Sequence, residues 1–110
     1  MAEYLYLFRG SHQQLSPEQM QQHMQKWSTW IAELSKRGQF KAGDPLEEGG
    51  KQVRGRKKAV TDGPFAEAKD LVGGYLIVNS GSLDEATELA RGCPILEVDG
   101  GVEVRPIRKI

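Results

Sequence analysis

The chain has a single cysteine, Cys93, among its 110 residues, so it cannot form an internal disulfide. This cysteine usage is typical of a reducing compartment such as the cytoplasm. No apolar run approaches the roughly 20 residues that a membrane-spanning helix needs. The first six residues also lack the basic segment and cleavage site of a signal peptide. We therefore expect a cytoplasmic protein without a membrane partner.

The chain also has no excess of charge of either sign, because it contains 15 Lys and Arg residues and 15 Asp and Glu residues. Proteins that bind nucleic acid through its phosphates need a basic surface, so we expect no nucleic-acid partner. The local basic run at residues 54–58 is interpreted as a solvated hairpin. Neither metal-ligand spacing of histidine and cysteine nor a glycine-rich phosphate loop occurs. We therefore expect no cofactor.

The length favours one domain covering residues 1–110. Ser16-Pro17-Glu18-Gln19 predicts a helix start, with Ser16 as the N-cap and Gln19 completing a capping box. Gly38 is placed to end this helix. A buried stripe is expected at helical spacing, formed by Met20, Met24, Trp27, Ile31 and Leu34.

A second, shorter helix is expected after Ser82, again with a capping-box pattern. Its inward side chains would be Leu83, Ala86, Leu89 and Ala90. Strands are predicted over residues 4–9, 40–46, 52–60, 71–79 and 102–107. Gly73-Gly74 indicates a bulge or a close backbone approach, and Pro106 indicates an edge position or a bulge.

The order β-α-β-β-loop-β-α-β is close to the split βαβ pattern of ferredoxin-like proteins. This predicts an α+β fold with an antiparallel sheet. Two helices can cover only one face of the sheet, yet the strands at 4–9 and 71–79 carry apolar side chains on both faces. A second copy of the sheet is the simplest cover, so we expect a homodimer with sheets packed face to face.

A dense turn signal, Asp62-Gly63-Pro64, is followed at once by an aromatic residue and three charges. The segment at residues 60–69 resembles the DGPF signature of the YCII-related family. The similarity continues in register at residues 73–77, 82–86, 92–94 and 102–107. It implies a ferredoxin-like subunit that dimerises into an α/β barrel. The family's biochemical role is largely unassigned, and DGPF proteins are associated with extracytoplasmic-function sigma factors.

His23 is the first candidate for chemistry, because it lies on the first helix four residues before Trp27 and could act as a general acid or base. The alternative is a half-buried histidine with one hydrogen bond. The resemblance suggests a histidine at this place paired with an acidic residue. Smaller YCII relatives carry an acid before the helix-ending proline, where this chain has Cys93. Asp62 is therefore the expected partner, although it could simply cap its own turn.

Five further residues are candidates for substrate binding. Trp27, Phe65 and Tyr75 would form pocket walls, Lys69 would hold an anionic group and Arg105 a carboxylate. The alternatives are packing in the core for the aromatic residues and a solvated surface position for the charged ones. Cys93 is interpreted as an inert buried thiol, because no cationic neighbour is visible in the sequence.

Two functions remain open at this point. The first is a cofactor-independent acid–base enzyme, such as an isomerase, lyase or hydrolase, that acts on a small molecule with His23 moving the proton and Asp62 orienting it. The second is a non-catalytic regulatory dimer that binds a ligand or partner, linked to sigma-factor systems. The sequence specifies no substrate, and fold analogy does not choose between the two functions.

Overall fold

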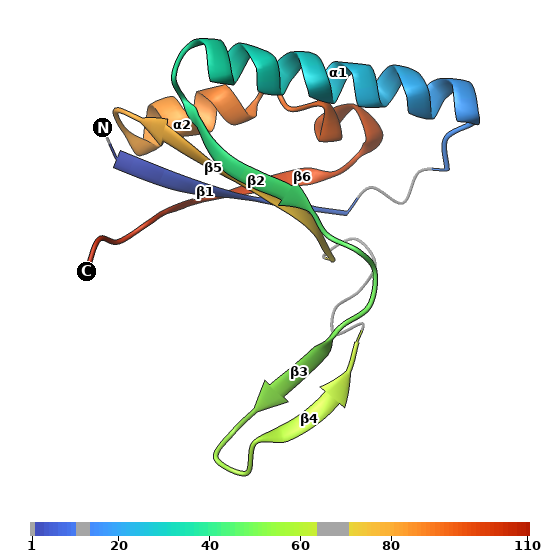
Figure 1. Ribbon diagram of the computed structural model, residues 1–110, viewed down its shortest axis with the longest axis vertical. Coiled ribbons are helices and arrows are strands. Elements are labelled where there is room, and N and C mark those ends of the chain that lie inside the picture. The colour runs from blue at the N-terminus through green and yellow to red at the C-terminus, as the bar shows by residue number, and fades with distance from the viewer. Residues whose placement is uncertain (1, 11–13, 64–70) are drawn as a thin grey trace.

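The computed structural model describes residues 2–10, 14–63 and 71–110. The elements are β1 (Ala2–Arg9), α1 (Pro17–Lys36), β2 (Phe40–Pro45), β3 (Lys51–Arg54), β4 (Ala59–Asp62), β5 (Val72–Ser80), α2 (Leu83–Ala90), the 3-10 helix η2 (Pro94–Val98) and β6 (Gly101–Pro106). Figure 1 shows α1, α2 and η2 together on one face of a four-stranded sheet. Within the described ranges, no helix has the length and apolar character needed to cross a membrane.

The sheet is antiparallel, with the strand order β2-β5-β1-β6. This is the order of the ferredoxin-like split βαβ unit, so the predicted α+β class is confirmed. The strands β1 and β5 lie at the centre, which explains why both carry apolar side chains along their whole length. The strand β6 lies at an edge of the sheet, as Pro106 predicted. A proline is tolerated there because its missing N–H would point away from the neighbouring strand.

An aromatic cluster forms the centre of the core between the sheet and the helices. The rings of Tyr6 and Trp30 stack with centroids 6.3 Å apart, and Phe8 meets Trp27 edge to face at 5.0 Å. The Tyr6 hydroxyl donates a hydrogen bond to the carbonyl oxygen of Ala86 on α2. Burial raises the pKa of Tyr6 to about 12, so the hydroxyl keeps its proton and this link between β1 and α2.

The helix α1 begins as predicted. The Ser16 hydroxyl accepts from the backbone N–H of Gln19, and the Gln19 side chain accepts from the backbone N–H of Ser16. The predicted buried stripe is wrong in its first half, because Met20 is 45% and Met24 56% exposed. Figure 1 shows the reason: the first turns of α1 extend beyond the end of the sheet. The buried residues of α1 are Trp30 and Leu34.

The second helix matches the prediction only in part. Ser82 caps α2 by accepting from the backbone N–H of Glu85, while the Glu85 carboxylate accepts from the side chain of Gln39. Ala86 and Ala90 are buried, but Leu83 is 43% exposed. Leu83 is the first residue of a helix only eight residues long, so it lies at the margin of the packed region.

The strand predicted over residues 52–60 is wrong. A turn with left-handed backbone at Gly55 (φ 74°) and Lys58 (φ 57°) divides it into β3 and β4. These two strands form a separate two-stranded sheet, which we call the arm (residues 51–62). Figure 1 shows the arm projecting from the body on the side opposite the helices. The radius of gyration, 15.5 Å, accordingly exceeds the roughly 13 Å of a compact chain of this length.

The second face of the four-stranded sheet carries an apolar centre with charged margins. Strand alternation places Leu5, Leu7 and Ile77 on this open face, where they are half-buried. At one margin Glu103 accepts from Arg9 at 3.0 Å and Arg105 at 3.2 Å. We call this surface the open face, and its cover by a second copy stays a prediction.

Candidate functional site

A cavity of about 460 Å³ lies between α1 and the end of the sheet formed by β2 and β5. Its lining is mainly aromatic and aliphatic, which is usual for small-molecule sites. The apolar lining residues are Phe8, Met24, Trp27, Ile31, Phe40, Pro45, Leu76 and Ile95. His23 is on the helix side of this lining, and we call the space the His23 cavity.

Two glycines let the strands at the floor of the His23 cavity approach each other closely. A Cβ atom on Gly43 would overlap the Leu76 side chain and lie 2.6 Å from the Tyr75 carbonyl oxygen. A Cβ atom on Gly74 would lie 3.2 Å from the Asp44 carbonyl oxygen. The close approach predicted at Gly73-Gly74 is therefore confirmed for Gly74, and backbone rather than side chains forms this part of the floor.

His23 is held by its neighbour on the same helix. The indole Nε1–H of Trp27 donates to Nε2 of His23 at 2.9 Å, one turn apart on α1. An imidazole that accepts at Nε2 carries its proton on Nδ1 when it is neutral. In this arrangement His23 offers a donor at Nδ1, and its lone pair at Nε2 is occupied by the indole.

Asp44 is the acidic residue of this region that the sequence interpretation missed. It lies at the end of β2, directly across from Tyr75 on β5, and its Oδ2 accepts from the Tyr75 hydroxyl at 3.2 Å. Both residues contribute to the lining of the His23 cavity. Strand alternation, however, places their side chains on the open face beside Leu7, away from α1. The only signal in the sequence was an acid between Gly43 and Pro45, at the end of a predicted strand.

The other predicted site residues do not gather in the His23 cavity of one chain. Asp62 ends β4 with its side chain 78% exposed, and its carboxylate pairs with Lys51 at 2.6 Å. Arg105 lies on the edge strand β6 and pairs with Glu103. Phe65 and Lys69 lie outside the described residues. Of the predicted residues, the cavity of one chain therefore contains His23 and Trp27, and Tyr75 contributes to the lining from the sheet. A pairing of Asp62 with His23 across two subunits stays a prediction.

Cys93 is a buried thiol at the start of η2. Desolvation raises its pKa to about 12, so it stays protonated and unreactive at neutral pH, as the sequence indicated. Among the residues that the structure describes, no three His, Cys, Asp or Glu side chains are grouped so that they could hold a metal ion.

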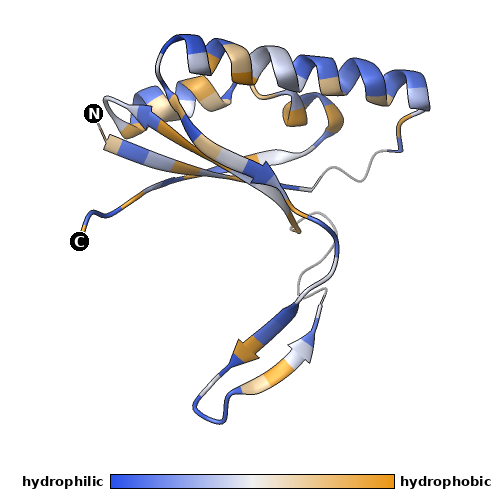
Figure 2. Cartoon of the chain, in the orientation of Figure 1, coloured by the Kyte–Doolittle hydropathy of each residue, from blue (hydrophilic) through white to orange (hydrophobic). Residues whose placement is uncertain are grey.

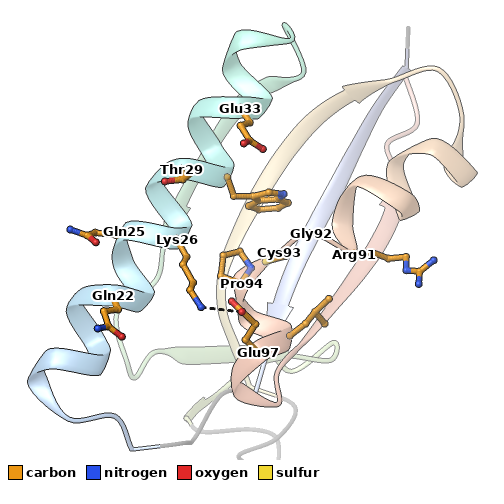
Figure 3. Close-up of a pocket in the computed structure, with 12 residues that line it drawn as sticks. Gln22, Gln25, Lys26, Thr29, Glu33, Arg91, Gly92, Cys93, Pro94 and Glu97 are labelled. Atoms are coloured by element: carbon orange, nitrogen blue, oxygen red, sulfur yellow. Dashed lines mark hydrogen bonds and ion pairs between the residues drawn. The ribbon is translucent and has the colours of Figure 1, made fainter.

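A second hollow, a surface groove of about 730 Å³, runs between α1 and η2 (Figure 3). Its sides carry solvated polar groups, and the ion pair of Lys26 with Glu97 crosses it at 3.1 Å. The indole of Trp30 reaches the groove beside Gly92, where a Cβ atom would lie 3.3 Å from Nε1. Among the described residues, no histidine lines the groove, and its lining is open and largely polar, so the His23 cavity is the better candidate site.

Comparison with known proteins agrees with this fold. A similar solved structure is that of 5-chloro-2-hydroxyhydroquinone dehydrochlorinase from Burkholderia phenoliruptrix AC1100, in complex with 2,5-dihydroxybenzoquinone. The two share 17% identity and a TM-score of 0.51 over 98% of this chain and 95% of the other. At this identity the likeness concerns the fold alone.

In sequence, an uncharacterized protein of Rhizobium meliloti (strain 1021) is 43% identical over 49 residues. That match covers 44% of this chain and only 40% of the relative's length. The model of the YCII-related domain matches residues 2–110. This match spans nearly the whole chain, and the protein belongs to the YCII-related domain family.

Proposed function

We propose that the protein is an acid–base enzyme that acts on a small planar molecule bound in the His23 cavity, without the help of a cofactor. The observation that carries this proposal is the position of His23, a titratable group, at the side of a mainly apolar cavity of about 460 Å³. This volume lies within the range of about 300–1,000 Å³ that is usual for small-molecule sites. Aromatic walls from Phe8, Trp27 and Phe40 suit a flat ring.

The complex of the similar structure supports the choice of substrate class. The dehydrochlorinase of Burkholderia phenoliruptrix AC1100 holds 2,5-dihydroxybenzoquinone, a planar ring with oxygen substituents. A substrate of this class would bring hydrogen-bond acceptors to a cavity whose helix side offers the Nδ1–H of His23 and the indole N–H of Trp27.

The bond between Trp27 and His23 defines how the imidazole would act. While Nε2 accepts from the indole, the neutral ring can only polarise a substrate oxygen through Nδ1–H. A substrate oxygen that takes the indole N–H for itself releases Nε2, which can then accept a proton from the substrate. The imidazolium formed in this way carries a proton on each nitrogen and can return one to another atom of the same substrate.

Which residue partners His23 in this step depends on the dimer. Within one chain Trp27 orients the imidazole, and Asp62 would take part only if the second subunit brings it to the cavity. We infer that the working form is a homodimer, because Leu5, Leu7 and Ile77 on the open face are only half-buried in the described part of one chain. Tyr75 and Asp44 lie on that same face, so a second copy would enclose them as well.

Binding and turnover can be measured separately with a panel of hydroxylated benzoquinones and hydroquinones, including chlorinated members. Tryptophan fluorescence reports binding, and the absorbance of the ring reports turnover. We expect turnover to be lost in His23→Gln, while affinity changes only a few fold. Gln21→Ala, an exposed site on the same helix, is the control. Affinity without turnover that His23→Gln leaves unchanged would favour the non-catalytic ligand-binding dimer instead.

A further inference from the structure

We propose that the arm clasps a second copy of this chain, pairing antiparallel with the arm of that copy so that the basic tip of each lies against the acidic root of the other. The tip is defined as Arg54, Arg56, Lys57 and Lys58, and the root as Glu47 and Glu48. This inference rests on the homodimer proposed above and adds a second contact to that of the open face.

The arm lacks the packing that a two-stranded hairpin needs. A hairpin of two short strands is marginally stable in water unless another surface covers one side. Val53 and Val60 lie directly across from each other on the arm, and they are 63% and 60% exposed. Figure 2 shows one apolar segment on each strand of this hairpin. Val53 and Val60 are therefore the side chains that a covering surface would bury.

The charges of the chain are divided between the arm and the rest. The arm holds five of the 15 basic residues and one of the 15 acidic ones, so the remainder has ten basic against 14 acidic residues. The arm thus carries a net charge of +4 and the remainder −4, at a total of zero. Complementary surfaces within one kind of chain favour its association with itself.

Within the described part of one chain, the charges of the tip and of the root have no ion-pair partner. Among the ion pairs of the described residues, none includes a tip cation or either root glutamate. Lys51 and Asp62, at the base of the two strands, are already paired with each other. The charges left free are therefore those at opposite ends of the arm.

A two-fold axis turns this distribution into a self-complementary contact. In an isologous dimer each surface meets its own copy in reversed direction. Two arms that cross antiparallel would bring each tip to the other root and enclose the apolar pairs Val53–Val60 between them. The arm also projects on the side of the open face (Figure 1), where the second sheet of the proposed homodimer would lie.

A nucleic acid fits this arm less well than a second copy does. The basic residues are confined to the tip, and the rest of the chain carries a net negative charge that would repel a phosphate backbone. The exposed valine pair would remain uncovered in such a complex. We therefore assign the arm to protein contact.

Charge reversal in two chains tests the pairing directly. The tip variant is Lys57→Glu with Lys58→Glu, and the root variant is Glu47→Lys with Glu48→Lys. Each alone should dissociate at least tenfold more readily than the natural chain in low salt, measured by sedimentation equilibrium, because positions 57–58 of the tip and 47–48 of the root then carry charge of one sign. An equimolar mixture should form heterodimers, detectable by native mass spectrometry, since positions 57–58 and 47–48 are then opposite in sign at both contacts. Lys36→Glu with Arg37→Glu, two exposed cations at the end of α1, is the matched control.

The outcomes separate the clasp from the homodimer itself. A natural chain that is monomeric at micromolar concentration overturns both. A dimer whose Kd the tip variant leaves unchanged, or variants that do not pair on mixing while circular dichroism shows them folded, overturns the clasp alone. Binding of a short DNA duplex that disappears in the tip variant, with the dimer unaffected, overturns the clasp in favour of a nucleic-acid contact.

Discussion

The indole N–H of Trp27 donates to Nε2 of His23 at 2.9 Å, so the candidate catalytic group and a wall of its cavity form one unit on α1. The four-residue spacing of the two side chains places them on the same face of the helix. The bond fixes both the orientation of the imidazole and the nitrogen that carries its proton. This relationship has a direct spectroscopic consequence.

We expect neutral His23 to be the Nδ1–H tautomer, and Trp27→Phe to populate the Nε2–H tautomer as well, because nothing on the helix then donates to Nε2. Correlation of the imidazole nitrogens with the ring protons by NMR distinguishes the two forms. The other histidine of the chain, His12, provides an internal reference in the same spectrum. A neutral ring that carries its proton on Nε2 in the natural protein would contradict this assignment.

The floor of the His23 cavity should tolerate a methyl group at Gly73 but not at Gly43. A Cβ atom on Gly43 meets the Leu76 side chain and the Tyr75 carbonyl, whereas one on Gly73 meets nothing within 4 Å. We expect Gly43→Ala to lower the free energy of unfolding by about 1–3 kcal/mol. Gly73→Ala should change it by less than about 1 kcal/mol. Urea denaturation measures both, and equal losses would show that β2 can move away from β5.

The buried thiol of Cys93 should make the fold sensitive to high pH. The native thiol keeps its proton up to a pKa of about 12, while the unfolded thiol releases it near 9.0. Unfolding between these values therefore releases a proton, so the free energy of unfolding falls as pH rises, by up to about 1.4 kcal/mol per pH unit. Cys93→Ala should show a shallower fall over this window in denaturant titrations. A thiol reagent that labels the native protein quickly at pH 7 would contradict the burial.

The open face should hold the homodimer together. Leu7→Glu places a charge at the centre of this face, beside Tyr75 of the neighbouring strand, and we expect it to convert the dimer to a monomer without loss of secondary structure. Leu96→Glu is the control, because Leu96 is 43% exposed on η2, which lies on the helical side of the sheet. Analytical ultracentrifugation measures the change. A dimer that persists in Leu7→Glu would place the interface elsewhere.

Local signals in the sequence predicted the elements that depend on local physics. The capping box at Ser16 follows from hydrogen bonds between residues three positions apart. The edge position of Pro106 follows from the hydrogen bond that a proline cannot donate. The helical spacing of Met20 and Met24 is equally regular, yet both are exposed because the sheet ends before the helix does. Periodicity records which side of a helix is apolar and not how far its partner extends.

The candidate site was predicted less completely for a similar reason. His23 and Trp27 are linked by helix geometry, so their proximity follows from the sequence. Asp44 meets Tyr75 only through the register of β2 with β5, which no short-range pattern specifies. Residues 52–60 were predicted as one strand, but a turn at Gly55 divides them into two. Asp62 therefore lies at the base of the arm, where it pairs with Lys51.

The division of the His23 cavity between a backbone floor and a helical wall has a consequence for how its specificity can change. Main-chain atoms at Gly43 and Gly74 present nearly the same chemistry whatever side chains surround them. On α1, in contrast, Met24, Ser28 and Ile31 line the cavity without being fully buried, so they can be exchanged without disturbing the pairing of the strands. Libraries confined to these three positions would therefore retune ligand preference while the scaffold remains intact.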